Sequence, residues 1–133
     1  MLRELLQIVG ANTKRGNGGM MALRIYLAVA WSALLAFTAY VVGHDGLGLL
    51  PIFFGAIGEG HWPGQFNADF LALLVLSALW TGWRNGWSFG GWVLAVAAFF
   101  GGAGFLMLYL LVLLHREGGN LRRVLLGVNA PPA

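Results

Sequence analysis

The chain has 133 residues, of which 59% are hydrophobic and only 10% are charged, and its mean hydropathy is +0.75. About a quarter of the residues of soluble domains are charged, so this composition excludes an ordinary soluble domain and predicts one small membrane domain. The formal net charge is +3 and there is no cysteine, which excludes a disulfide framework, a thiolate metal site and a cysteine nucleophile. We expect lipid contacts and no nucleic-acid partner, because no basic face carries interleaved aromatic residues.

Residues 1–19 form a polar N-terminal segment ahead of the predicted membrane domain at 20–117. Apolar residues recur there at helical spacing between charged ones, which predicts a short amphipathic helix suited to a membrane surface or a partner. Those apolar residues are Leu2, Leu5, Leu6 and Val9. The sequence ANTKRGNGG then predicts a flexible basic linker. The pair Met20-Met21 leaves open whether residues 1–19 are an extension of a shorter protein.

A first membrane span is predicted over about residues 21–42. Arg24 lies near its start, where a long basic side chain can reach the membrane interface. Small residues recur along one face at the spacing of close helix packing, which predicts a contact with another helix. This stripe consists of Ala28, Ser32, Ala36, Ala39 and Gly43. We interpret the hydroxyls of Ser32 and Thr38 as bonded to their own helix backbone, since two hydroxyls do not make a transport path.

Residues 43–67 are predicted as a loop that contains a short apolar run, LGLLPIFFGAIG. The run is too short to span a bilayer and contains Pro51, so it is expected to be re-entrant or interfacial. Two carboxylates and two imidazoles in this loop are a plausible ligand set for a divalent metal. They are His44, Asp45, Glu59 and His61. The alternative, which we favour, is ordinary interfacial polarity with Trp62 as an anchor and no resident metal or cofactor.

A second span is predicted over about residues 66–84. Asn67 is expected to cap its start, which places Asp69 in a first turn that favours a carboxylate. An ionisable residue so near hydrocarbon is otherwise a functional candidate, and capping is the simpler interpretation. Four tryptophans gather around the turn RNGWSFGG beside Arg84 and predict an aromatic belt at one membrane face. These tryptophans are Trp80, Trp83, Trp87 and Trp92.

The third span, predicted over residues 91–114, has 24 residues without a charge. A helix of that length is about 36 Å long, enough to cross a hydrocarbon core of ~30 Å. Its first half carries two faces of small residues. One face could pack against the small-residue stripe of the first span, and the other could pack against the second helix or a partner. The first face consists of Gly91, Ala95, Ala98 and Gly102, and the second of Ala97, Gly101 and Gly104. Residues 118–133 are expected to form a short amphipathic basic tail.

The distribution of Lys and Arg predicts an orientation. Three spans with a cytoplasmic N-terminus put five basic residues inside and three outside, which favours an outside C-terminal tail. A fourth crossing at residues 47–61 gives seven inside and one outside, but the length of that segment and its Pro51 argue against it. We therefore predict an all-α membrane protein with three transmembrane helices and a cytoplasmic N-terminus.

The order of segments resembles a family of small three-helix bacterial membrane proteins of unknown function. The resemblance rests on NADFLALLVLSALW and LMLYLLVLLHRE and covers about Leu23–Glu117. The family shares an acidic residue at the start of the second helix, matched by Asp69, and a leucine/tyrosine run followed by Arg-Glu. That run is matched by Tyr109, Arg116 and Glu117. The resemblance implies the fold and a bacterial cytoplasmic-membrane protein, and supplies no activity; the glycine cluster 101–104 and both tails lie outside it.

The function expected from these features is that of an accessory or scaffolding subunit in a larger membrane complex, bioenergetic or photosynthetic in type. No nucleophile–base pair or phosphate-binding loop is present in the sequence, so we expect no enzyme activity. One alternative is a binding protein for a hydrophobic ligand: a quinone, carotenoid, chlorophyll-type pigment or lipid. His44, His61 and His115 are then candidate pigment ligands, and the four belt tryptophans are candidate stacking partners. Another alternative is a homo-oligomer assembled through the glycine faces.

Overall fold

The computed structural model describes residues 1–132, apart from the side chains of residues 8–17. Its elements are α1 (Leu2–Asp45), α2 (Leu49–Glu59), α3 (Trp62–Arg84), α4 (Phe89–Arg116), α5 (Leu121–Leu126) and the 3₁₀ helix η1 (Gly127–Asn129). Three helical segments are long and apolar enough to cross a membrane, namely Gly18–Asp45, Trp62–Arg84 and Phe89–Arg116. The shorter apolar helix α2 lies between the first and second of them. The predicted all-α class is confirmed, with three apolar helices of membrane-spanning length and a shorter apolar helix between the first and second, and the chain has the structure of an integral membrane protein.

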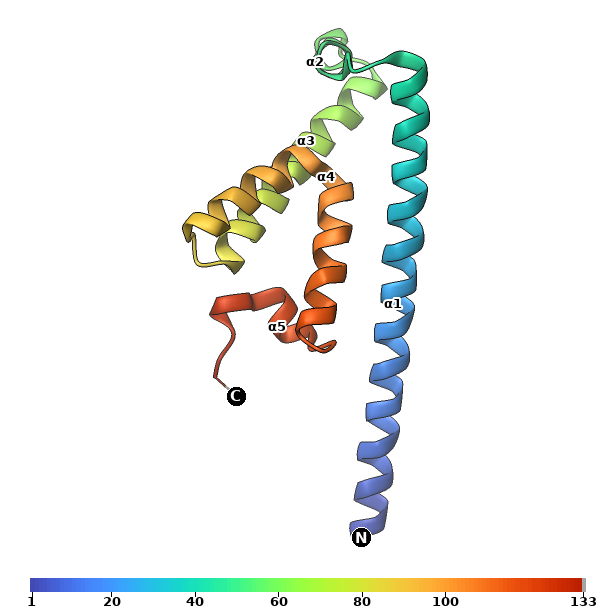
Figure 1. Cartoon of the computed structure of the whole chain (residues 1–133), viewed down its shortest axis with the longest axis vertical. Coiled ribbons are helices and arrows are strands. Elements are labelled where there is room, and N and C mark those ends of the chain that lie inside the picture. Colours follow the sequence, from blue (N-terminus) through green and yellow to red (C-terminus); the bar gives the residue numbers. More distant parts are fainter. Residues whose placement is uncertain (133) are drawn as a thin grey trace.

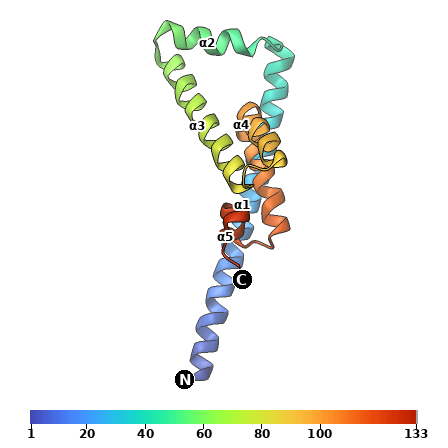
Figure 2. The same cartoon turned by 90° about the vertical axis from the view of Figure 1, so that its left-hand side faces the viewer.

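The helices are arranged around α4, which packs on both α3 and α1. Figure 1 shows α1 as a long straight helix, with the second half of α4 alongside it and the first half of α4 against α3. α2 bridges the upper ends of α1 and α3, and α5 lies across the other end of α3 and α4 (Figure 2). The predicted short N-terminal helix and flexible basic linker are instead parts of the uninterrupted helix α1, although the side chains of residues 8–17 lie outside the described part of the chain.

The second membrane helix begins earlier than the sequence predicts. α3 starts at Trp62, with His61 in the capping position and a proline in the first turn. Because proline has the φ angle of a helix and needs no hydrogen-bond acceptor there, Pro63 favours this earlier start. Asn67 is therefore inside the helix, where its Nδ2 donates to the Phe53 carbonyl of α2 at 3.0 Å. The prediction that Asn67 caps the helix is wrong, and Asp69 lies two turns inside α3.

Helix α4 is broken at Gly102, which has φ 55° and ψ −142°. A positive φ of this kind favours glycine, and a Cβ atom on Gly102 would lie only 3.1 Å from the ring of Phe70. The residues before the break number 13 and those after it 14. Each half is therefore about 20 Å long, which is shorter than a hydrocarbon core of ~30 Å. Figure 1 shows the second half running back toward the end of α3.

The two ends of α4 lie at the same end of the molecule. Asn85, in the turn that precedes α4, donates from Nδ2 to the hydroxyl of Tyr109 in its second half at 2.9 Å. Arg24, near the start of the membrane segment of α1, donates from Nη2 to the Leu114 carbonyl at 3.1 Å. The expected position of the C-terminal tail, opposite to the start of the first span, is therefore wrong. The cause is the break at Gly102, which the sequence pattern of an uninterrupted apolar run does not reveal.

The best-packed part of the molecule is small and lies where α1, α4 and α5 meet. Leu27, Leu113, Leu114 and Val124 form this cluster, and each is less than 5% exposed. Many large apolar side chains elsewhere are exposed, as lipid-facing residues of a membrane protein are. The cluster fixes α5 to the helix ends and thereby holds the C-terminal segment in place.

Candidate functional site

The small-residue stripe of α1 is not packed within the chain. All five of its residues are exposed, and a Cβ atom on Gly43 would meet no other atom within 4 Å. α4 instead contacts the other side of α1, where Leu27 is 4% exposed. The prediction that the small residues of the third helix pack against this stripe is wrong, because the half of α4 beside α1 is the leucine-rich half after Gly102. The Ser32 hydroxyl donates to the Ala28 carbonyl at 2.8 Å, as its interpretation as a backbone-bonded hydroxyl requires.

The two small faces of α4 have different surroundings. Gly91, Ala95, Ala98 and Gly102 are buried. Gly102 lies against α3, with Phe70 and Leu74 nearest to the position of a Cβ atom. Gly101, on the second face, is exposed and lines a cavity. The first face is therefore buried inside the chain, whereas the second is only partly covered, with Gly104 near Leu34 of α1.

This cavity lies between α1, α2, α3 and the break in α4 and has a volume of about 730 Å³. That size is within the range of small-molecule pockets, roughly 300–1,000 Å³. Its lining is aromatic and aliphatic, with the side chain of Thr38 and the backbone of 101–104 as its polar parts. The aromatic members are Trp31, Phe53, Phe54, Phe70, Phe99, Phe100 and Phe105. The hydrogen bond from Asn67 to Phe53 holds α2 beside it.

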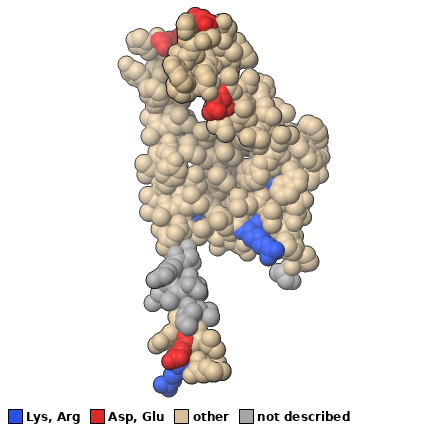
Figure 3. All heavy atoms as spheres, turned by 180° about the vertical axis from the view of Figure 1, so that it is seen from behind, with Lys and Arg blue, Asp and Glu red and all other residues tan. Residues whose placement is uncertain are grey.

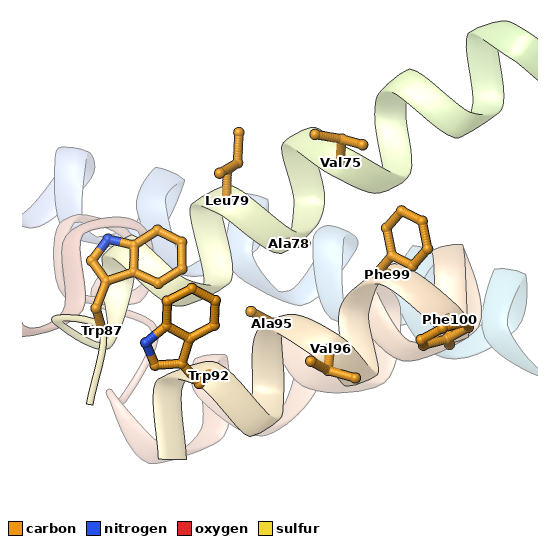
Figure 4. Close-up of a pocket in the computed structure, with 9 residues that line it drawn as sticks. All are labelled: Val75, Ala78, Leu79, Trp87, Trp92, Ala95, Val96, Phe99 and Phe100. Carbon is orange, nitrogen blue, oxygen red and sulfur yellow. The ribbon is translucent and has the colours of Figure 1, made fainter. Parts of the chain in front are cut away.

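A second cavity of about 260 Å³ lies between α3 and the first half of α4. Trp87 and Trp92 close one end of it, with ring centroids 4.9 Å apart (Figure 4). Trp87 has φ 53°, and its ring lies where a Cβ atom on Gly82 would be, so this arrangement requires glycine at position 82. The structure thus brings two of the four belt tryptophans together.

The side chain of Trp80 and the backbone of Trp83 help to hold the C-terminal segment. Trp80 Nε1 donates to the Leu125 carbonyl at 3.1 Å, and the Trp83 carbonyl accepts from Asn129 Nδ2 at 2.9 Å. The four tryptophans therefore do not form one ring-binding site.

The candidate metal ligands do not converge. His44 Nδ1 and Asp45 Oδ1 are 2.8 Å apart at the exposed end of α1. Glu59 ends α2, and His61 precedes α3. Within the described residues there is no group of three or more side chains of metal-binding type. His115 is at the end of α4, so the three histidines do not share one pigment site either.

Asp69 lies on the face of α3 that points away from the other helices. Its helical neighbours Phe66 and Leu73 are 64% and 55% exposed, and Asp69 is exposed as well. Among the described residues, no ion pair involves its carboxylate. A span needs about 20 residues, and 20 residues counted back from Arg84 reach Gln65, which puts Asp69 inside the hydrocarbon region. The capping interpretation of Asp69 is thereby removed.

Arg84 has a role that the sequence pattern did not indicate. It is 6% exposed and donates from Nε to the Val124 carbonyl at 2.5 Å, with Nη2 3.3 Å from the Arg123 carbonyl. Its Nη1 donates to the hydroxyl of Tyr109 at 3.3 Å. A cation at the last carbonyls of α5 is favoured by the negative end of that helix. The sequence feature that could have indicated this contact is Tyr109, a single tyrosine within a run of leucines.

Charge is divided between two ends of the molecule. The basic end contains Arg24, Arg84, Arg116, Arg122 and Arg123, together with Glu117. The acidic end, around α2, contains Asp45, Glu59 and Asp69. Figure 3 shows this separation over the body of the molecule, with red spheres toward α2 and blue ones toward the opposite end. This asymmetry makes the two ends of the membrane domain chemically different, one basic and the other acidic.

Scans of protein-family models, curated proteins and solved structures found no match to this chain. Function is therefore inferred from the geometry and chemistry of the chain itself.

Proposed function

We propose that this protein is an accessory subunit of a larger integral membrane complex and that it docks on a transmembrane helix of a partner. The observation that carries the proposal is Asp69, an exposed carboxylate on an apolar, outward-facing side of α3. A charged side chain costs roughly 2.5–3.5 kcal/mol at the centre of a membrane helix and less toward its ends, where Asp69 lies, and intramembrane charges are usually paired. A basic residue of a partner helix would provide that pairing.

The charge distribution favours a different protein as this partner. The arginines of the described body lie at the basic end, whereas Asp69 lies near the acidic end. Among its described side chains, a second copy in the same orientation therefore has no Lys or Arg at the depth of Asp69. A partner helix with Lys or Arg in its non-cytoplasmic half would fit.

The uncovered stripe of α1 supports the same function through different chemistry. Small residues let two helix backbones approach closely in a membrane, where van der Waals packing rather than the hydrophobic effect drives association. The exposed positions Ala36 and Gly43 therefore offer a second helix-packing surface.

The proposal is tested by tagging the full-length protein and recovering it from native membranes in a mild detergent. Asp69→Asn and Ala36→Leu are each expected to reduce the recovery of a defined partner by at least about fivefold, about 1 kcal/mol. Ala33→Leu is the matched control, because Ala33 is an exposed alanine of the same helix outside the stripe. Equal recovery with all three variants, or crosslinking only to a second copy, would contradict the proposal.

A second candidate function is the binding of a hydrophobic ligand such as a quinone, a carotenoid or a lipid. It is favoured by the aromatic cavity at the break in α4, about 730 Å³ in volume. Ala103→Phe, which fills this cavity, is expected to lower the amount of ligand extracted with organic solvent, whereas Ala33→Phe leaves it unchanged. Protein without a chromophore band and without extracted quinone or bound lipid would remove this candidate.

The cellular placement belongs to the same proposal. We place the protein in a bacterial cytoplasmic membrane, with its N-terminus in the cytoplasm. The positive-inside rule supports the orientation, because Arg3, Lys14 and Arg15 precede the first span in the sequence and Arg24 lies near its start. The resemblance to the small three-helix family supports the bacterial origin.

A further inference from the structure

Helix α1 gives a scale for depth in the membrane. Arg24 and Asp45 are 21 residues apart on it, about 32 Å along the axis, close to the thickness of a hydrocarbon core. Arg24 bonds the Leu114 carbonyl near the end of α4. That end, and not the break at Gly102, is therefore at the membrane boundary marked by Arg24.

Both ends of α4 lie at that boundary. It begins five residues after Arg84 and ends at Arg116, and neither half is long enough to cross. Non-helical backbone at membrane depth is tolerated where protein surrounds it or where it lines a cavity, and Gly102 is buried and lines one. With α4 re-entrant, all eight Lys and Arg of the sequence belong to one side of the membrane, whereas three complete crossings divide them five to three. The positive-inside rule therefore favours the re-entrant path.

Helix α5 is held across the helix ends at this boundary. Arg84 and Trp80 donate to its carbonyls, and its own residue Val124 is fully buried against the body. Figure 2 shows α5 at the end of the body opposite to α2. Its exposed side chains are of two kinds, apolar and basic. Leu121 and Leu125 are 41% and 46% exposed, and two arginines are exposed as well. Apolar and basic side chains side by side at the membrane boundary are typical of an interfacial segment.

We propose that this basic end, formed by α5 and the end of α4, binds the headgroups of anionic phospholipids in the cytoplasmic leaflet. Arg116 and Arg122 are exposed and supply positive charge, while Leu121 and Leu125 reach the acyl region. Among the residues that the structure describes, Glu117 supplies the one carboxylate there, and it faces Arg123 at 4.0 Å, which leaves a net positive surface. A soluble acidic partner would leave the exposed leucines in water, so a lipid surface fits better. The inference is independent of the proposed docking through Asp69.

The test uses the full-length protein in nanodiscs with equal amounts of phosphatidylglycerol and phosphatidylcholine. Native mass spectrometry then counts the lipids retained. We expect phosphatidylglycerol to be retained preferentially, and Arg116→Gln and Arg122→Gln each to lower that preference about fivefold, from ~1 kcal/mol per basic residue near an anionic surface. The preference is also expected to fall between 0.15 and 1 M salt, as the screening length shrinks from about 8 to 3 Å.

The matched control is Glu59→Gln, which changes one charge at the acidic end. It is expected to leave the lipid preference unchanged, and an effect of net charge alone would increase it. The Arg116 side chain makes no hydrogen bond or ion pair among the described residues, so Arg116→Gln still tests the proposal if Arg122→Gln disturbs the folding of α5. Equal retention of the two lipids by the wild type, or an unchanged preference in both arginine variants, would overturn the proposal.

Discussion

Asn85 and Tyr109 are joined by a hydrogen bond of 2.9 Å, although they are 24 positions apart in the sequence and most of α4 lies between them. The bond ties the turn before α4 to the half of α4 that follows the break. The Tyr109 hydroxyl is also 3.3 Å from Arg84 Nη1, and the Arg84 guanidinium lies 5.8 Å from the centre of the Tyr109 ring. One tyrosine thus connects the α3–α4 turn, the second half of α4 and, through Arg84, α5.

Tyr109→Phe is expected to destabilise the protein. The ring stays, but two donors lose their acceptor, and an unsatisfied buried donor costs about 1–3 kcal/mol. The unfolding temperature in detergent should fall by several degrees, measured by tryptophan fluorescence. Tyr40→Phe is the control, because Tyr40 is 69% exposed. Equal unfolding temperatures for the two variants would show that the Tyr109 hydroxyl does not contribute to the stability of the protein.

Gly102→Ala is expected to disturb the break in α4. The backbone angles of Gly102 are close to a region that essentially only glycine adopts, so alanine there costs about 1–3 kcal/mol, and its Cβ would lie 3.1 Å from the Phe70 ring. The unfolding temperature should fall, and the hydrogen bond between Asn85 and Tyr109 should weaken as the two halves straighten. Gly90→Ala, at an exposed position of the same helix with no atom within 4 Å of a Cβ, should be neutral or stabilising. A Gly102→Ala protein as stable as wild type would argue against a required break.

The sequence predicted the elements of the fold better than their path. Hydropathy and length located all three long apolar helices and the short one, because each is an uninterrupted local signal. The break at Gly102 was missed, because Gly101, Gly102 and Gly104 also fit helix packing in a membrane. The sequence misplaces Asp69 for a similar reason. Asn67 is a good capping residue, which puts Asp69 in a first turn, and only the contact between Asn67 and Phe53 shows that Asn67 binds α2 instead. Both candidate site features therefore depend on contacts between distant residues.

Arg84→Gln is expected to release α5 from the body. Hydrogen bonds to charged groups contribute about 1.5–3 kcal/mol each, so losing even one should raise amide exchange in residues 121–126 at least about tenfold. Exchange in α1 should change much less, because α1 is held mainly by α4. Arg116→Gln removes the same charge without these contacts and serves as the control. Unaltered protection of α5 in Arg84→Gln would mean that Val124 and Trp80 suffice to hold it.

The path of α4 can be tested directly, because the chain has no cysteine and single cysteines are unambiguous probes. Leu47→Cys lies in the α1–α2 turn, where Leu47 is 86% exposed, and Val128→Cys lies after α5, where Val128 is 68% exposed. In intact cells a membrane-impermeant maleimide is expected to label Leu47→Cys alone. Val128→Cys and Leu2→Cys should react only after permeabilisation, because the basic end faces the cytoplasm. Labelling of Val128→Cys from outside, with Leu2→Cys protected, would mean that α4 crosses completely, and the anionic-lipid surface would then face the wrong leaflet.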